Sequence, residues 1–330
     1  MSNKKEAYLC LSAMLRAREP KLLNNDRAER MLDASSFEEC AKLLTDCGYG
    51  DMSQMSAKEI EAELAARRKE IFAEMDNICP DKELVDVFRI KYDYHNIKAI
   101  IKAEAMGLDA QRLLSDAGRI NPEELLTIYN EDRCSELPKA LADAVAEAKS
   151  TLARTANPQL ADFILDKAYF AEMTEAAKKL DSKFLRGYVA VLIDSANLKS
   201  AVRTLRMGKP ADFLETVLIK GGELDADRIS AAGDAESIAA LFSHSGLEKA
   251  AALGAEAAAG GSMTAFELAC DNAVNAYLCG AKLVSYGPEA VIAYIAAVEG
   301  EITAVRMILT GRLSGIEPQV IRERLRDLYA

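Results

Sequence analysis

The chain has 330 residues, half of them hydrophobic, and it carries 41 Lys and Arg against 52 Asp and Glu, a formal net charge of −11. This acidic balance disfavours nonspecific nucleic-acid binding, because phosphate contacts need clustered Lys and Arg, and we expect no nucleic acid among its partners. The sequence has no tryptophan and only two histidines. Two histidines leave little room for a histidine-based metal site or catalytic network. At roughly 150 residues per domain, the length alone suggests about two globular domains.

The sequence shows neither a secretory signal nor a membrane-spanning segment. No apolar stretch follows the positively charged start MSNKKEAYLC in the way a signal peptide requires. The longest uninterrupted apolar run, residues 291–298, is far shorter than the about 20 residues of a membrane-spanning helix. The seven cysteines form no CxxC pair. We interpret them as reduced thiols of a cytosolic protein, buried as small hydrophobic side chains.

Signals for helix starts and ends recur along the chain. Ser36 and Ser56 are each followed three residues later by glutamate, which is the spacing of a capping box. Prolines at positions typical of the first helical residue, and glycines typical of a left-handed residue just past a helix end, divide the chain into helical segments. The prolines are Pro122, Pro158, Pro288 and Pro318, and the glycines are Gly48, Gly107, Gly208 and Gly311.

Between these signals the apolar residues recur every three or four positions, which predicts helices. The three longest stripes cover residues 81–106, 181–207 and 288–310. The best strand-like run, residues 217–219, is too short to define a strand. We therefore predict an all-α fold with helices well above the usual mean of about 11–12 residues.

An internal repeat lies within the three stripes. Residues 93–107 read DYHNIKAIIKAEAMG and residues 194–208 read DSANLKSAVRTLRMG, so Asp, Asn, Lys and a Met-Gly pair recur at the same spacing. A weaker third copy, EITAVRMILTG at 301–311, lacks the asparagine, and its glycine comes four residues early. The signature residues are Asp93, Asn96 and Lys98 in the first copy, Asp194, Asn197 and Lys199 in the second, and Glu301 and Arg306 in the third.

Three copies of the repeat predict three similar helical units, which we place at residues 1–115, 116–220 and 221–330. Asp93 and Asn96 lie three residues apart and so share a helix face beside the apolar Ile97. Such a pair can hydrogen-bond the backbone at the end of a neighbouring helix, since buried polar groups must be paired. On one interpretation the signature residues fix helix packing within each unit. On the other they form a shared contact with a partner.

We find no motif for a catalytic or cofactor site. The sequence lacks the GxxxxGK[ST] phosphate loop, the GxGxxG dinucleotide fingerprint, the HExxH zinc motif and the GxSxG nucleophile elbow. His95 and His244 have no evident acid–base partners, so we interpret them as packing, surface or loop residues. We expect no catalytic, cofactor-binding or metal-binding residue and no cofactor.

Several further stretches, taken with the repeat, form a series that covers most of the chain. Their order resembles the C subunit of the V-type and A-type ATPases, whose eukaryotic relative is the d subunit. The stretches are residues 88–107 (with YDYHNIK at 92–98), 166–170 (DKAYF), 194–208, 266–267, 270–272, 287–290 (GPEA), 306–311 (RMILTG) and 321–326 (IRERLR).

The resemblance implies an all-α, funnel-shaped protein of three similar helical units around a pseudo-threefold axis. It also implies a non-catalytic central-stalk (rotor) subunit on the cytoplasmic face of the membrane, bound to the membrane only through protein partners. The implied partners are the membrane rotor ring (the proteolipid c/K ring) and the D and F subunits of the central stalk. In this role the chain is a socket that transmits torque, coupling ATP hydrolysis or synthesis to proton or sodium ion transport.

Two other functions stay open at this point. Stacked helical units provide extended binding surfaces, which would suit a protein-interaction scaffold unrelated to rotary ATPases. An all-α enzyme acting on isoprenoid diphosphates would need an aspartate-rich Mg²⁺ site, because carboxylates and substrate phosphates hold Mg²⁺. No DDxxD motif occurs in the sequence.

Overall fold

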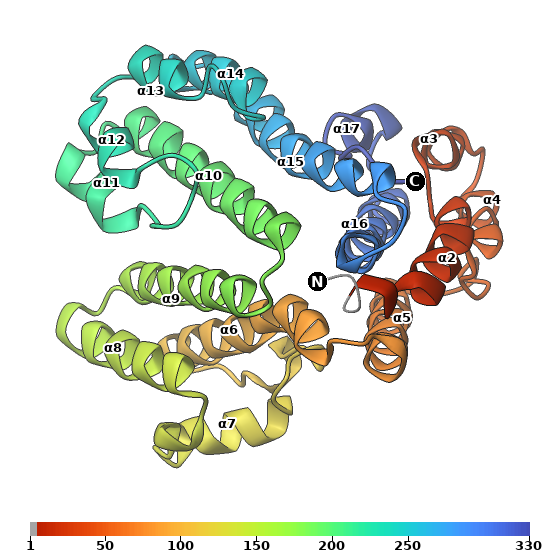
Figure 1. The fold of residues 1–330 in the computed structure, drawn as a ribbon, viewed down its shortest axis with the longest axis horizontal. Helices are drawn as coiled ribbons and strands as arrows, with labels where there is room; N and C mark the ends of the chain where they lie inside the picture. Colours follow the sequence, from red (N-terminus) through yellow and green to blue (C-terminus); the bar gives the residue numbers. More distant parts are fainter. Residues whose placement is uncertain (1–4) are drawn as a thin grey trace. The chain divides into compact units, whose positions relative to one another are not determined.

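The computed structural model describes residues 5–330, and within this range the chain is built from helices without a strand (Figure 1). The predicted all-α class is confirmed. The longer elements are α2 (Leu9–Arg18), α3 (Asn25–Asp33), α4 (Phe37–Lys42), α5 (Ala57–Ile78), α6 (Lys82–Met106), α7 (Pro122–Asn130), α8 (Lys139–Thr155), α9 (Pro158–Lys179), α10 (Lys183–Arg206), α11 (Ala211–Val217), α12 (Ala226–Ala231), α13 (Ala235–Leu241), α14 (Glu248–Ala258), α15 (Met263–Cys279), α16 (Pro288–Leu313) and α17 (Pro318–Arg322). Short 3₁₀ turns are η1 (Glu19–Lys21), η2 (Thr45–Cys47), η3 (Gln111–Leu113), η4 (Cys134–Glu136) and η5 (Gly280–Leu283).

The predicted helix starts are confirmed by the caps that the structure forms. The Ser36 side chain accepts from the Glu39 N–H at the start of α4. Ser56 and Glu59 form a reciprocal capping box at the start of α5, which satisfies two backbone donors that a helix end leaves unpaired. The four prolines named above each open a helix, at α7, α9, α16 and α17.

One predicted helix end is wrong. Gly311 lies inside α16, which continues to Leu313. A β-carbon at this position would lie 2.7 Å from Ile321 Cδ1, so α17 packs closely against α16 here and a larger residue would displace the buried Ile321 side chain. The helix instead ends before Gly315, which has the left-handed backbone (φ +68°) that glycine adopts without strain.

The chain packs as two compact units, one formed by residues up to 82 together with 234–330 and the other by residues 83–233. These units are defined by packing, whereas the predicted boundaries at 115 and 220 come from the repeat. The division into three repeated units therefore stays a prediction.

In the unit that holds both ends of the chain, α16 is the central helix. It packs against α2, α3, α4, α5, α15 and α17. Most of its residues are buried, from Ala290 to Gly311, as expected of a helix that is apolar on all sides. The core of this unit thus joins the N-terminal helices to the C-terminal ones.

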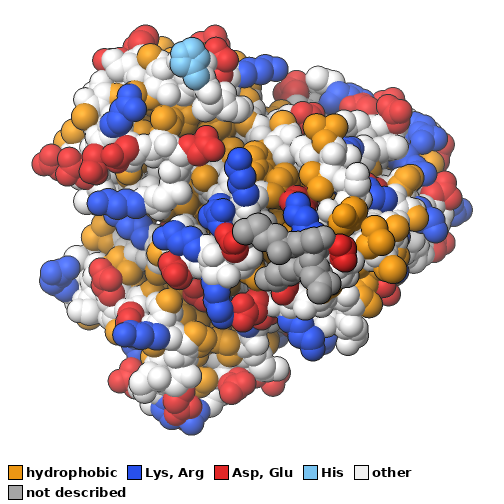
Figure 2. All heavy atoms as spheres, in the orientation of Figure 1, with side chains coloured by type: hydrophobic (Ala, Val, Ile, Leu, Met, Phe, Trp, Pro, Cys, Tyr) orange, Lys and Arg blue, Asp and Glu red, His pale blue; other side chains and the backbone are white. Residues whose placement is uncertain are grey.

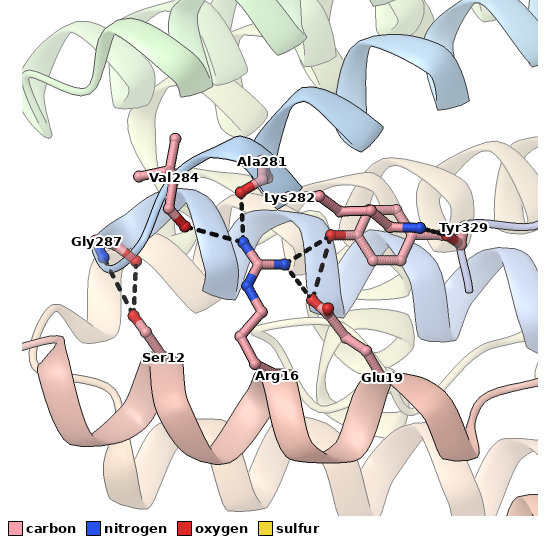
Figure 3. A network of polar contacts seen from close by, with 8 residues as sticks. All are labelled: Ser12, Arg16, Glu19, Ala281, Lys282, Val284, Gly287 and Tyr329. Atoms are coloured by element: carbon pink, nitrogen blue, oxygen red, sulfur yellow. Dashed lines mark hydrogen bonds and ion pairs between the residues drawn. The ribbon is translucent and has the colours of Figure 1, made fainter.

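Arg16 of α2 ties these two ends of the chain together (Figure 3). Its guanidinium donates to the Ala281 carbonyl, to Glu19 Oε1 at 2.6 Å and to the Tyr329 hydroxyl at 3.1 Å. The Lys282 ammonium lies over the Tyr329 ring, 4.5 Å from its centroid. Tyr329 is therefore held to the N-terminal segment by its hydroxyl, while its ring lies under Lys282 of η5.

In the other unit, α8 and α9 form an antiparallel hairpin, and α9 packs against α10 (Figure 1). Two ion pairs join α6 to α9, one between Lys98 and Asp166 and one between Lys102 and Asp162 at 2.7 Å. The short helices α11 and α12 cover α10.

The surface carries both signs of charge. On the face shown in Figure 2, acidic and basic side chains are interspersed with hydrophobic ones. Of the seven cysteines, all free thiols, Cys40, Cys47, Cys79 and Cys270 are buried, whereas Cys10 is exposed. The prediction that the cysteines are buried is thus confirmed at some positions only. Within residues 5–330, none of the helices combines the length and the apolar character needed to cross a membrane.

Candidate functional site

The signature residues of the first copy hold the loop that follows α6. Asp93 is fully buried, and its Oδ1 accepts from the backbone N–H groups of Arg119 (2.9 Å) and Ile120 (3.3 Å). The Arg119 side chain also donates to Asp93 Oδ2 at 2.6 Å. Asn96 pairs with both backbone groups of Ser115, with each bond 2.8 Å long. The pair on α6 therefore fixes the loop at two points.

The second copy holds the loop after α10 in the same way. Asp194 accepts from the N–H groups of Glu223 (3.1 Å) and Leu224 (3.3 Å). Asn197 pairs with both backbone groups of Ile219 at 2.8 Å. Residues 217–219, the best strand-like run of the sequence, lie at the end of α11 and in the loop that follows.

The third copy holds a segment from the opposite end of the chain. Glu301 is 1% exposed on α16, and its carboxylate accepts from the Leu23 N–H at 2.5 Å and from the Tyr49 hydroxyl at 2.8 Å. Leu23 follows α2 and η1, so the loop that corresponds to those after α6 and α10 comes here from the N-terminal part of the chain.

All three acids bind the N–H of an apolar residue that stands directly before a helix N-cap. The apolar residues are Leu23, Ile120 and Leu224, and the N-caps that follow them are Asn24 of α3, Asn121 of α7 and Asp225 of α12. An apolar residue before the N-cap fixes the direction in which the chain enters a helix. Each buried acid therefore fixes the residue at which one short helix begins.

The length of the acid varies with the residue that lies against it. A β-carbon at Gly118 or Gly222 would overlap with Oδ1 of Asp93 or Asp194, respectively, so these loops need glycine to reach the short aspartate. Lys21 takes the corresponding place before Leu23. Glu301 is one methylene longer than aspartate, so it reaches a loop that need not approach so closely.

The missing asparagine of the third copy has a similar cause. Ser115 and Ile219, the partners of Asn96 and Asn197, each stand five residues before the anchored apolar residue. The corresponding residue before Leu23 is Arg18, which is the last residue of α2. Its N–H is already paired within the helix, so Ala304 in place of asparagine leaves no such donor unpaired.

The three long helices also end alike. Gly107, Gly208 and Gly315 follow α6, α10 and α16 with φ of +65°, +61° and +68°. In each case the next N–H bonds back across the turn, from Leu108 to Ala103, Lys209 to Thr204 and Ile316 to Gly311, which is the Schellman pattern. The third glycine is therefore Gly315 and does not come early, and Gly311 corresponds to Ala103 and Thr204.

The basic signature residues lie on the flanks of the long helices. Lys98 pairs with Asp166 of α9, and Arg306 pairs with Glu61 of α5 through bonds of 2.7 and 2.9 Å. Lys199 is half-buried on α10. In the first two copies the structure thus brings the acid and the asparagine to one loop, while Lys98 and Arg306 pair with other helices.

Burial raises the pKa of all three acids, because desolvation disfavours the charged form. Beside Asp93, the Arg119 guanidinium opposes this shift. Asp194 is stabilised by the backbone N–H groups of Leu224 and Glu223, and burial raises its pKa from 3.8 to about 6. The Asp194 carboxyl therefore changes its charge state close to neutral pH.

These groups position backbone and do not converge on a common cavity as donors for a substrate. Among residues 5–330, no group of three or more His, Cys, Asp or Glu side chains is placed to hold a metal ion. The fold and the site together define a protein of long buried helices whose signature residues organise the loops between them.

Comparison with known proteins gives the family. The profile of the ATP synthase (C/AC39) subunit matches residues 11–324, and the chain belongs to this family. The C subunit of the V-type sodium ATPase of Enterococcus hirae is 23% identical over 98% of this chain and 99% of its own length. The C subunit of the A-type ATP synthase of Methanocaldococcus jannaschii is 27% identical over 97% of this chain and 86% of its own length. The C subunit of the V-type ATP synthase of Thermus thermophilus is 25% identical over 67% of this chain and 69% of its own.

The close approach of Gly222 to Asp194 predicts the effect of adding one methyl group. We expect Gly222→Ala to lower the free energy of unfolding by about 1–3 kcal/mol, because the loop must move away from the carboxylate. Chemical denaturation measures this loss. Gly246→Ala is the control, because its β-carbon meets nothing within 4 Å, and we expect a change within about 1 kcal/mol. Equal losses in the two variants would contradict the anchoring role of Asp194.

The raised pKa of Asp194 predicts a pH dependence of stability. The folded state binds this proton more tightly than the unfolded state, so the contribution is fully present below the unfolded pKa of 3.8 and is lost as pH rises through about 6. Asp194→Asn cannot titrate. We expect wild type to lose on the order of 2 kcal/mol relative to this variant between pH 4 and pH 7. If the free energies of unfolding of the two proteins changed in parallel with pH, the pKa of Asp194 would not be raised in the folded state.

Proposed function

We propose that the chain is a non-catalytic central-stalk (rotor) subunit of a V/A-type ATPase, a socket that links the membrane rotor ring to the central shaft. The observation that carries this proposal is the family match over residues 11–324, together with relatives that are named as the C subunit of such enzymes over nearly their whole length. Membership of this family favours the rotor role over a scaffold unrelated to rotary ATPases.

The proposed partners are the proteolipid ring on the membrane side and the D and F subunits of the central stalk on the other. The chain would lie on the cytoplasmic face of the membrane and be bound there through these proteins. Its role would be to transmit torque between ATP hydrolysis or synthesis and ion transport. Among the relatives, that of Enterococcus hirae is named for sodium and that of Methanocaldococcus jannaschii for ATP synthesis.

A torque-transmitting part must resist bending, and the anchors of the long helices support this requirement. The three long helices have 25, 24 and 26 residues, which at about 1.5 Å per residue gives rods of nearly 40 Å. Each rod is tied to a neighbouring loop by a buried acid. These bonds oppose relative movement of the helix and of the short helix that the loop begins.

We also propose that the repeats are arranged differently from the sequence-based boundaries. The first repeat comprises α6–α9 and the second α10–α15. The third combines α16 with α2–α5, because Glu301 anchors Leu23 as Asp93 and Asp194 anchor their own loops. The two ends of the chain thereby complete one repeat, and a load on either end is shared by both.

Co-purification tests the proposed function. An affinity-tagged chain, expressed at natural levels in its source organism, is expected to retain the other central-stalk proteins and the proteolipid ring after mild detergent extraction. The purified chain alone is expected neither to bind nor to hydrolyse ATP, as measured by calorimetry and phosphate release. An assembled rotor in which ring and shaft are joined without this chain would refute the proposal, and so would magnesium-dependent ATP turnover by the chain alone.

A further inference from the structure

A groove of about 800 Å³ runs along the hairpin of α8 and α9 and is closed on one side by Thr216 of α11. All of its lining residues belong to the unit formed by residues 83–233. The repeat signature does not explain this groove, because its lining includes none of the signature residues.

The floor of the groove is a second apolar face of α9. One face of this helix is fully buried and includes Ala161, Leu165 and Met173. Leu160, Phe163 and Ile164 lie on the face toward the groove and are only half-buried. A helix that is apolar on both faces is normally covered on both. Within the unit formed by residues 83–233, this face is covered only in part, where the Phe163 ring meets that of Phe213 of α11 with 6.0 Å between the ring centroids.

Alanines leave the space for a partner. Ala140 and Ala144 of α8, and Ala168 and Ala171 of α9, line the groove at positions four and three residues apart. Such spacing puts each pair on one helix face. Small side chains along two neighbouring helices allow a third helix to approach within the usual interaxial distance of about 8–10 Å.

The rim of the groove is acidic. Asp143 and Glu147 of α8 are exposed along it, as is Glu175 of α9, whose carboxylate lies 3.7 Å from the ammonium of Lys178. Asp143 and Glu147 lie four residues apart, and like charges at this spacing destabilise a helix. The lining holds four carboxylates and two cations, Arg154 and Lys167. One of the carboxylates, Glu172, is already bonded to Arg119 and Tyr94.

We propose that the α8–α9 groove binds an amphipathic helix of another subunit, with an apolar ridge on the alanine-lined floor and Lys or Arg side chains against the rim. The inference rests on the proposed function, because the partner is taken to be part of the same complex. A second copy of this chain does not fit, since its charge of −11 opposes that of the rim. The rim charges would speed association and select the basic partner.

Photo-crosslinking in the purified, assembled complex tests the groove directly. A benzophenone amino acid replaces Ala168 on the floor, and in a matched control it replaces Ala146, which is exposed on α8 outside the groove. We expect position 168, but not position 146, to crosslink to a helical segment with net positive charge, identified by mass spectrometry. A crosslink to an acidic or non-helical segment, or none, would overturn the inference.

A charge reversal gives the second measurement. We expect Glu147→Lys to weaken binding of the chain to the rest of the complex by about tenfold, because the new lysine faces the basic partner. Glu256→Lys, at an exposed site in α14, is expected to change this binding less than twofold, and equal effects of the two substitutions would count against the groove.

The outcomes distinguish the two proposals. If the wild-type chain joins no ATPase complex, the proposed function fails. If it joins and position 168 gives no crosslink, only the groove inference fails.

Discussion

A buried carboxylate that accepts a backbone N–H just before a helix N-cap is the interaction on which this structure depends. A buried charge is costly unless it is hydrogen-bonded, so Asp93, Asp194 and Glu301 cannot leave their loops without a large loss of free energy. The same bond serves the loop, whose N–H would otherwise be buried without a partner. Each long helix therefore carries the group that fixes the start of a short helix: α7 for α6, α12 for α10 and, from the other end of the chain, α3 for α16.

The details around the acids follow from the same constraint. Where the acid is aspartate, the loop needs glycine, at Gly118 and Gly222, to come close enough. Where it is Glu301, the longer side chain reaches a loop with Lys21 at that place. The third copy of the repeat is thus adapted rather than degenerate. It receives its loop from the N-terminal segment. There the N–H of Arg18, which corresponds to the N–H groups that Asn96 and Asn197 pair with, is already bonded within α2.

Much of the fold could be predicted from local signals, but the pairing of the chain ends could not. Capping boxes, prolines and apolar stripes placed the long helices, because these depend on neighbours within a few residues. The spacing of Asp93 and Asn96 indicated a polar pair without showing its partners, which lie in a loop beyond the helix. Glu301 and Leu23 are 278 residues apart, and no local pattern connects them. Gly311 resembles a helix end in the sequence, but it lies inside α16 where the Ile321 side chain packs against it. The α8–α9 groove was missed because both faces of α9 are apolar, so its periodicity resembles that of a core helix.

Amide hydrogen exchange at Leu23, Ile120 and Leu224 tests the central claim most directly. These three N–H groups lie in loops, where amides ordinarily exchange quickly, yet each is bonded to a buried acid. If the acids anchor the loops, the three amides exchange as slowly as the interiors of α6, α10 and α16, because exchange then requires opening of the packed core. Exchange as fast as that of exposed loop amides would show that the acids do not hold the chain in place.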